Sequence, residues 1–299
     1  MGGFEESYVS AAGRESGDGR TEYLSGALVT RLRDLGEGGV EVTYKSLEDA
    51  GAEEKSVRAD FVVGADGPSS VVRKLLDPEA ERKYVGYAAW RGTVKESLLT
   101  AETNEFIGKT VTLYFEKGLQ ILTYKIPALN GTIKPGECLA NIVWYQNYTP
   151  SELQDLLTDT SEKPHTYSLG INKIKPAFKI KQQEIAAKTL PEPLAELFQK
   201  VESPFIQAVT DCLATKSVFM NGKVVLVGDA LAGVRPHTTC GTTQAALHAF
   251  LLGKVFEGEM GIGEWGKKAM EFGNFVQGVG VKMGDLSQFG DHPDAGGAE

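Results

Sequence analysis

One stretch of the chain combines residue types that recognise a polyhydroxylated ligand. Val224 to Val227 form an apolar run typical of a buried strand, and Gly228 and Asp229 follow directly. Ligands of α/β folds bind at such strand ends, where the Asp229 carboxylate can accept hydrogen bonds from a sugar-like chain. Farther on, Gly241 and Thr242 open an Ala-rich helix whose positive end would face the ligand. The stretch predicts a nucleotide- or flavin-binding site.

Another strand-turn-helix pattern lies nearer the N-terminus. Its strand ends at Gly64, where a side chain would block close approach of a ligand, and Asp66 and Gly67 form a turn. A following serine can cap the next helix, and Arg73 can reach a carboxylate or phosphate. Alone, the pattern also fits a plain capped turn. The two patterns together, about 160 residues apart, favour a functional site.

Composition narrows the class of protein. The 299 residues are 41% hydrophobic and 24% charged, as in ordinary globular proteins, and the net charge of -9 argues against nucleic-acid binding. No apolar run approaches the ~20 residues that span a bilayer, so no transmembrane segment is expected. The chain starts without an apolar signal region, and its three cysteines form no metal pattern. We therefore expect a cytoplasmic protein without a metal site.

The order of elements predicts an α+β fold in which an α/β domain is interrupted by a mainly antiparallel β-sheet domain. Residues 1–20 are rich in Gly, Ser and Glu and are expected to be a disordered lead-in. Segments 21–83 and 214–284 carry the two patterns described above. The insert, 84–213, is rich in aromatic and β-branched runs. Residues 285–299 are expected to be a frayed tail.

Five local predictions depend on short patterns. Ala27–Leu35 is predicted as a strand or short helix, and Val57–Val63 as one strand. Pro204–Leu213 is predicted as a helix. Asn221-Gly222 between two strand-like runs predicts a tight hairpin turn, and the last helix is expected to end near Gly280.

Together the two patterns resemble the class A flavoprotein monooxygenases, the para-hydroxybenzoate hydroxylase-like family. The stretch around Asp229 resembles the family's flavin-ribityl fingerprint, and the pattern around Asp66 is similar to its Asp-Gly fingerprint. Tyr84–Gly92 and the loop at Arg235-Pro236-His237 are similar to the 2,6-dihydroxypyridine 3-monooxygenase-like branch. The resemblance implies that the cofactor is bound by Gly64, Asp66, Gly67, Arg73, Gly228, Asp229, Pro236, Gly241 and Thr242.

The resemblance also implies a reaction and roles. NAD(P)H would reduce FAD, O2 would supply oxygen, and an aromatic or heteroaromatic ring would be hydroxylated. Asp229 would hold the ribityl chain, and the amides near Gly241 and Thr242 would face the N1 and O2 region of the flavin. Asp66 and Arg73 would support the FAD chain and the approach of the nicotinamide cofactor.

Four residues are candidates for contacting the small aromatic substrate. His237 adjoins Pro236 in the loop, and Tyr114 and Tyr124 lie on predicted strands, as does the related candidate Tyr145. Structural roles stay open for all of them: a loop histidine can make a fixed hydrogen bond, and sheet tyrosines can belong to the core. The substrate, the choice between NADH and NADPH, and a possible homodimer also stay open.

The family's first unit has no counterpart in this sequence. That unit is a strand, Gly-x-Gly-x-x-Gly and a helix, and it seats the ADP half of FAD. Nothing before Asp60 supplies it, and Gly261–Gly266 matches the spacing only after a helix-like segment. Thr239 and Thr243 also replace a usual Gly and Asn of the flavin loop. We expect a family member lacking about a hundred residues. Its function is then either hydroxylation or that of a truncated, non-catalytic remnant that binds FAD weakly or not at all.

Overall fold

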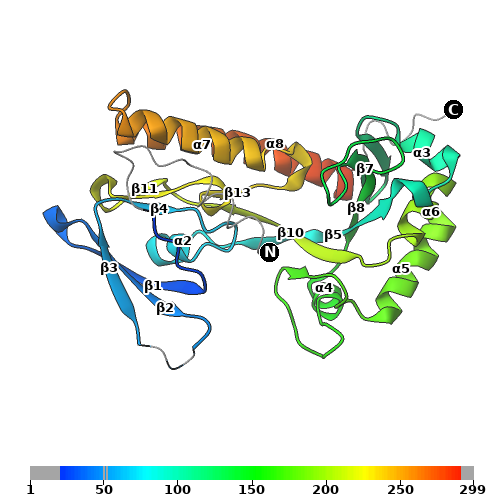
Figure 1. Ribbon diagram of the computed structural model, residues 1–299, viewed down its shortest axis with the longest axis horizontal. Coiled ribbons are helices and arrows are strands. Elements are labelled where there is room, and N and C mark those ends of the chain that lie inside the picture. Colours follow the sequence, from blue (N-terminus) through cyan, green and yellow to red (C-terminus); the bar gives the residue numbers. More distant parts are fainter. Residues whose placement is uncertain (1–20, 50, 52, 291–299) are drawn as a thin grey trace. The chain divides into compact units, whose positions relative to one another are not determined.

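The computed structural model describes residues 21–49, 51 and 53–290 (Figure 1). The chain divides into two compact units, Met1–Val62 and Val63–Glu299. Helices make up 38% and strands 29%, and the sheets are mainly antiparallel, which confirms the predicted α+β class. The predicted lead-in, 1–20, lies outside the described residues. The division into an interrupted domain and an insert stays a prediction.

The first unit is built on a three-stranded antiparallel sheet. Its strands, in spatial order, are β1 (Ala27–Asp34), β2 (Val40–Ser46) and β3 (Lys55–Ala59). Of the two alternatives for the first segment, the strand is observed. The single strand predicted over Val57–Val63 is wrong, because β3 ends at Ala59 and a separate β4 spans Val62–Gly64. The chain breaks there because β3 pairs with β2, whereas β4 joins another sheet.

The second unit contains a seven-stranded sheet whose assigned strand pairs are antiparallel. Its spatial order is β13-β10-β5-β8-β7-β6, and β9 pairs with β10. The strands are β5 (Lys83–Lys95), β6 (Thr112–Glu116), β7 (Leu119–Ile126), β8 (Leu139–Asn147), β9 (Ser168–Leu169), β10 (Phe205–Leu213) and β13 (Ala232–Gly233).

The two faces of this sheet pack against different clusters of side chains, because successive side chains of a strand point to opposite faces. Trp90 and Trp144 are paired across β5 and β8, and they belong to the large hydrophobic core. Their neighbours Ala89 and Tyr145 face the other side, in a smaller cluster. The core lies toward four helices, which are α3 (Ala101–Ile107), α4 (Pro150–Leu156), α5 (Pro176–Thr189) and α6 (Glu192–Gln199).

Two elements of this region differ from the sequence analysis. The helix predicted over Pro204–Leu213 is wrong, since the segment is strand β10. Its Ala and Gln residues suit a helix, but β10 lies between β5 and β13, and this long-range pairing decides its conformation. Helix α5 was missed because its apolar residues do not gather on one face.

A small sheet and two long helices complete the second unit. The sheet has the order β11-β12-β4, with β11 (Val218–Phe219) and β12 (Val224–Leu226) antiparallel, so the predicted hairpin is confirmed. Helices α7 (Gly241–Phe256) and α8 (Ile262–Phe289) follow. Within the described residues, no helix is long and apolar enough to span a bilayer.

The end of α8 corrects the predicted frayed tail. The helix runs to Phe289 rather than ending near Gly280. Asn147 Nδ2 donates to the Gln288 carbonyl at 2.8 Å, and Ser287 Oγ donates to Gln120 Oε1 at 2.9 Å. These partners lie on the large sheet, far away in sequence. The chain beyond residue 290 is outside the described part.

Glycines on one face of α8 allow its close packing. A Cβ at Gly284 would overlap the Tyr87 hydroxyl and lie 2.9 Å from Arg235 Nη1, whereas a Cβ at Gly278 would meet nothing within 4 Å. We expect Gly284→Ala to destabilise the protein by about 1–3 kcal/mol through overpacking. The matched control Gly278→Ala should stabilise it by up to about 1 kcal/mol through helix propensity. Denaturant unfolding of both variants measures this, and equal effects would contradict the packing described.

Candidate functional site

Arg73 joins the two sequence patterns in space. Its side chain is 3% exposed and lies on α2 (Val71–Leu76). Its guanidinium donates to the Ala230 carbonyl at 2.8 Å and, more weakly, to the Asp229 carbonyl at 3.4 Å. It also donates to the carbonyls of Pro68 at 2.6 Å and Ala80 at 3.3 Å. The sequence analysis assigned the guanidinium N–H groups of Arg73 to a ligand. In the structure they bond backbone carbonyls, so Arg73 holds the loops of the site in place.

Asp66 has a similarly local role. Its Oδ2 accepts from the amides of Val71 at 2.7 Å and Val72 at 3.0 Å, and its Oδ1 accepts from the Ser70 hydroxyl. Asp66 thus satisfies the start of α2, although the sequence analysis placed it on the cofactor. The glycine at position 64 is explained by packing, because a Cβ there would lie 2.7 Å from a Leu226 methyl. Gly67 adopts a positive φ of 76°, as its turn requires.

Asp229 occupies a different environment from Asp66. Its side chain lines two cavities, of about 390 and about 440 Å³, that share Gly241 and Thr242. Among the described residues its carboxylate has no hydrogen-bond partner. Burial raises the pKa of Asp229, and the Arg82 charge only partly opposes this. A half-buried carboxylate without a partner is costly unless a ligand supplies hydrogen bonds. Asp229 is therefore the strongest binding candidate in the site.

The start of α7 faces the same space. Gly241 and Thr242 form its first turn, and Cys240 at the N-cap makes no side-chain capping bond. The first amides of the helix are therefore available to an electron-rich ligand, with the helix dipole adding to their effect. Gly241 approaches Asp229 closely, since a Cβ there would lie 3.7 Å from Asp229 Oδ1. Pro236 lines the 390 Å³ cavity from the preceding loop.

The large sheet forms one wall of the 390 Å³ cavity. Most of its contributions come from the face opposite the main core, namely Ala89, Arg91, Tyr145, Gln207 and Val209, and β10 adds Ala208 and Thr210. Of the predicted tyrosines, Tyr114 pairs with Ile121 and packs against the main core, so it is on the wrong face for the cavity. Tyr124 shares the face of Tyr145 but lies four residues beyond Gln120, the residue paired with Tyr145. Neither Tyr114 nor Tyr124 lines the cavity.

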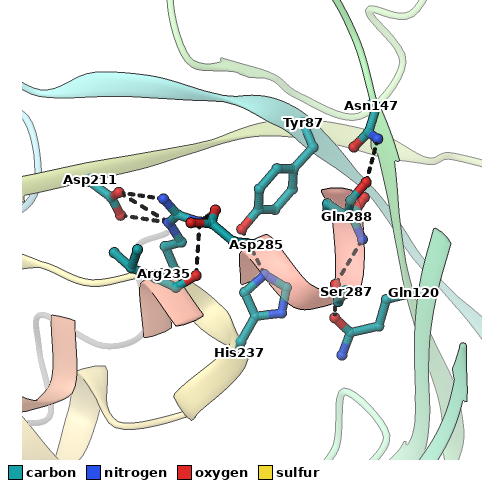
Figure 2. A network of polar contacts seen from close by, with 10 residues as sticks. Tyr87, Gln120, Asn147, Asp211, Arg235, His237, Asp285, Ser287 and Gln288 are labelled. Atoms are coloured by element: carbon teal, nitrogen blue, oxygen red, sulfur yellow. Dashed lines mark hydrogen bonds and ion pairs between the residues drawn. The ribbon is translucent and has the colours of Figure 1, made fainter. Parts of the chain in front are cut away.

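A polar network centred on Arg235 adjoins the 390 Å³ cavity (Figure 2). The Arg235 guanidinium donates to both carboxylate oxygens of Asp211 at 2.9–3.0 Å, and its Nη1 donates to Asp285 Oδ1 at 2.7 Å. Figure 2 shows Arg235 between these two aspartates, beside Tyr87 and His237. Asp211 belongs to β10 and Asp285 to α8. Arg235 therefore ties the loop to both elements.

His237 lies in this network rather than on the cavity surface. It is 7% exposed, its Nε2 is 2.8 Å from the Tyr87 hydroxyl, and its ring centroid is 4.7 Å from that of Tyr145. Its Nδ1 has no partner in the described part of the chain. Burial, with the Arg235 charge, lowers the pKa of His237 to about 4. The imidazole is therefore neutral at pH 7 and reaches the cavity through Tyr145.

This lowered pKa has a measurable consequence. Between pH 6.5 and pH 4 the unfolded chain binds a proton at His237 that the folded chain does not, so stability falls as pH falls through this window. The free energy of unfolding of the wild type therefore falls between pH 7 and pH 5, and we expect this fall to be about 2 kcal/mol smaller in His237→Gln. Urea unfolding of both proteins at the two pH values measures it. Parallel losses in the two proteins would contradict the lowered pKa.

Comparisons with known proteins agree with this geometry. A family model described as an FAD binding domain matches residues 21–146, and one described as FAD binding domain-like matches residues 84–211. The 2,6-dihydroxypyridine 3-monooxygenase of Paenarthrobacter nicotinovorans is 31% identical over 199 residues, which are 66% of this chain and 48% of the relative. The chain belongs to the FAD-binding class A monooxygenase family. A salicylate hydroxylase of Pseudomonas putida is 26% identical over 257 residues, 79% of this chain and 53% of the relative.

Solved structures share the fold of this chain. A 2,6-dihydroxypyridine-3-hydroxylase from Arthrobacter nicotinovorans matches with a TM-score of 0.77 and 25% identity, over 88% of this chain and 64% of that one. Klebsiella pneumoniae HpxO, complexed with FAD and uric acid, matches with a TM-score of 0.62 and 18% identity, over 88% and 58%. The chain spans about half the length of the curated relatives it matches.

Two residues that line the 390 Å³ cavity, Gln207 and Arg82, escaped the sequence analysis. Gln207 lines the cavity from β10, and recognising that strand by its alternation would have placed it. Arg82 donates to Thr210 Oγ1 at 2.7 Å and to Ser69 Oγ at 2.8 Å, and it belongs to no recognisable sequence motif. Thr239, which replaces a usual Gly, has a left-handed φ of 55°. This conformation explains why Gly suits that position.

Proposed function

We propose that this chain supplies the flavin-ring and substrate half of an FAD-dependent hydroxylase that acts on a small aromatic or heteroaromatic ring with NAD(P)H and O2. The observation that carries the proposal is the desolvated carboxylate of Asp229, unpaired among the described residues, where two cavities meet the open start of α7. The printed activities of the two curated relatives support the class of substrate.

The residues present fit the ribityl and ring portion of FAD. Asp229 would accept hydrogen bonds from ribityl hydroxyls, and the free amides at Gly241 and Thr242 would face the electron-rich edge of the ring. When bound, FAD supplies the hydride acceptor and the site of O2 activation. The protein's own contribution is to hold negative charge on that edge and to keep the site dry.

The sheet face would hold the substrate. Ala89, Val209 and Tyr145 offer an apolar surface for a planar ring, while Arg91 and Gln207 offer polar groups that can orient its substituents. Tyr145 stays protonated because burial raises its pKa. Behind it, the neutral His237 ring packs against Tyr145 and bonds the Tyr87 hydroxyl, which positions Tyr145.

Substrate-stimulated oxidation of NAD(P)H tests the proposal. The flavin-loaded protein should oxidise NADPH or NADH faster when a dihydroxypyridine or a hydroxybenzoate is added, and the hydroxylated product should appear. Reduction that is insensitive to every aromatic would count against hydroxylation. Protein that remains colourless after reconstitution with FAD would favour the alternative, a non-catalytic remnant.

A further inference from the structure

A separate cavity, of about 330 Å³, lies on the opposite side of the large sheet from the flavin site. It is lined by residues of β5 and β8 and of the helices α4 and α5. The two cavities share strands but not residues. Ala89 and Arg91 line the flavin cavity, and Trp90 between them lines the separate one. Tyr145 and Gln146 divide in the same way on β8.

A chain of hydrogen bonds forms the floor of this cavity. Trp90 Nε1 donates to the Tyr148 hydroxyl at 2.8 Å, which donates to Gln146 Oε1 at 2.9 Å. Gln182 Nε2 donates to the same Gln146 oxygen at 2.7 Å. Burial raises the pKa of Tyr148 to about 12, so its hydroxyl keeps its proton.

Each bond of this chain has a defined donor. An indole N–H can only donate, so the Tyr148 oxygen accepts from Trp90. The Tyr148 hydroxyl donates in turn to the carbonyl oxygen of the Gln146 side chain. That oxygen accepts a further hydrogen bond from the NH2 group of Gln182.

This polarity leaves one acceptor and one donor group unused. Gln182 Oε1 and Gln146 Nε2 have no hydrogen-bond partner among the described residues, and the Gln182 residue is only 3% exposed. Both glutamines line the cavity. Tyr148 and Phe178 add aromatic side chains to the same cavity.

We propose that this cavity is a second small-molecule site, specific for a planar ring that carries a cis-amide, such as a lactam. A lactam C=O accepts from Gln146 Nε2 while its adjacent N–H donates to Gln182 Oε1, and the ring packs against the aromatic side chains. Strands β5 and β8 also line the 390 Å³ cavity. A ligand bound here therefore contacts the two strands that, in the proposed function, hold the substrate.

Calorimetric titration with 2-pyridone, a six-membered lactam, tests the proposal. The wild-type protein should bind 2-pyridone, and N-methyl-2-pyridone, which lacks the N–H, should bind about tenfold more weakly. Gln182→Met should weaken 2-pyridone binding by a similar factor. The control Gln154→Met, on the exposed surface of α4, should leave it unchanged.

The outcomes separate this cavity from the flavin site. Binding of 2-pyridone that Gln182→Met leaves intact, or equal affinity for the N-methylated ring, would overturn the proposal. If Gln182→Met does not fold, the NMR signal of the Trp90 indole N–H is followed in the wild-type protein instead. That signal should shift with 2-pyridone and not with the N-methyl analogue, and an unmoved signal would also overturn it. Neither result depends on FAD binding.

Discussion

Replacing Asp229 by alanine should weaken flavin binding by about 10- to 100-fold, the value of one or two hydrogen bonds to a charged acceptor. The reason is that Asp229 presents a desolvated carboxylate to both cavities, with no hydrogen-bond partner from the described residues. Fluorescence titration with FAD measures the dissociation constant. The control Asp60→Ala removes an exposed carboxylate that lines neither cavity and should leave that constant unchanged.

The same variant has another expected effect that a purely structural residue would not show. Burying an unpaired carboxylate costs stability, so Asp229→Ala without flavin should unfold at the same temperature as the wild type or higher. Functional groups held for a ligand behave in this way. A variant that binds flavin normally, or one that loses flavin only because it unfolds, would contradict the assigned role.

Replacing Arg235 by methionine should destabilise the protein by about 3 kcal/mol, because it leaves buried carboxylate oxygens without their partner. The Arg235 side chain is 7% exposed and that of Asp211 is 19% exposed, whereas Asp285 is half exposed and contributes less. Burial lowers the pKa of Arg235, but the hydrogen bonds to Asp211 and Asp285 outweigh it and raise that pKa, so the guanidinium stays charged.

A matched control lies on α8. Lys267→Met breaks an ion pair with Glu271 whose side chains are 76% and 64% exposed, and it should cost less than about 1 kcal/mol. Denaturant unfolding compares the two variants. Similar values for both would mean that Arg235 does not anchor the loop between β10 and α8.

The parts of the site that sequence could predict are those with a local cause. The apolar run Val224–Val227, followed by Gly228-Asp229 and an Ala-rich segment, predicted a strand, a turn and a helix. The structure has β12, a turn and α7 at these positions. The hairpin at Asn221 was also predictable, because a left-handed φ of 54° favours asparagine. Each signal lies within a few residues of the feature it predicts.

The parts that escaped prediction depend on partners far away in the chain. Arg73 was expected to meet a ligand, yet its donors meet carbonyls that include Ala230, 157 residues away. Strand β10 is set by its neighbours β5 and β13 rather than by its own composition. The last turn of α8 is held by Asn147 and Gln120. A single sequence contains no record of these pairings.

The central claim is that Asp229 and the start of α7 form the ribityl and ring half of a flavin site. Titrating the protein with FMN and with FAD, followed by flavin fluorescence, tests it most directly. The groups described here contact only the part that both molecules share, so both should bind, with affinities within about tenfold of each other. If neither flavin binds to the folded protein, the claim is contradicted.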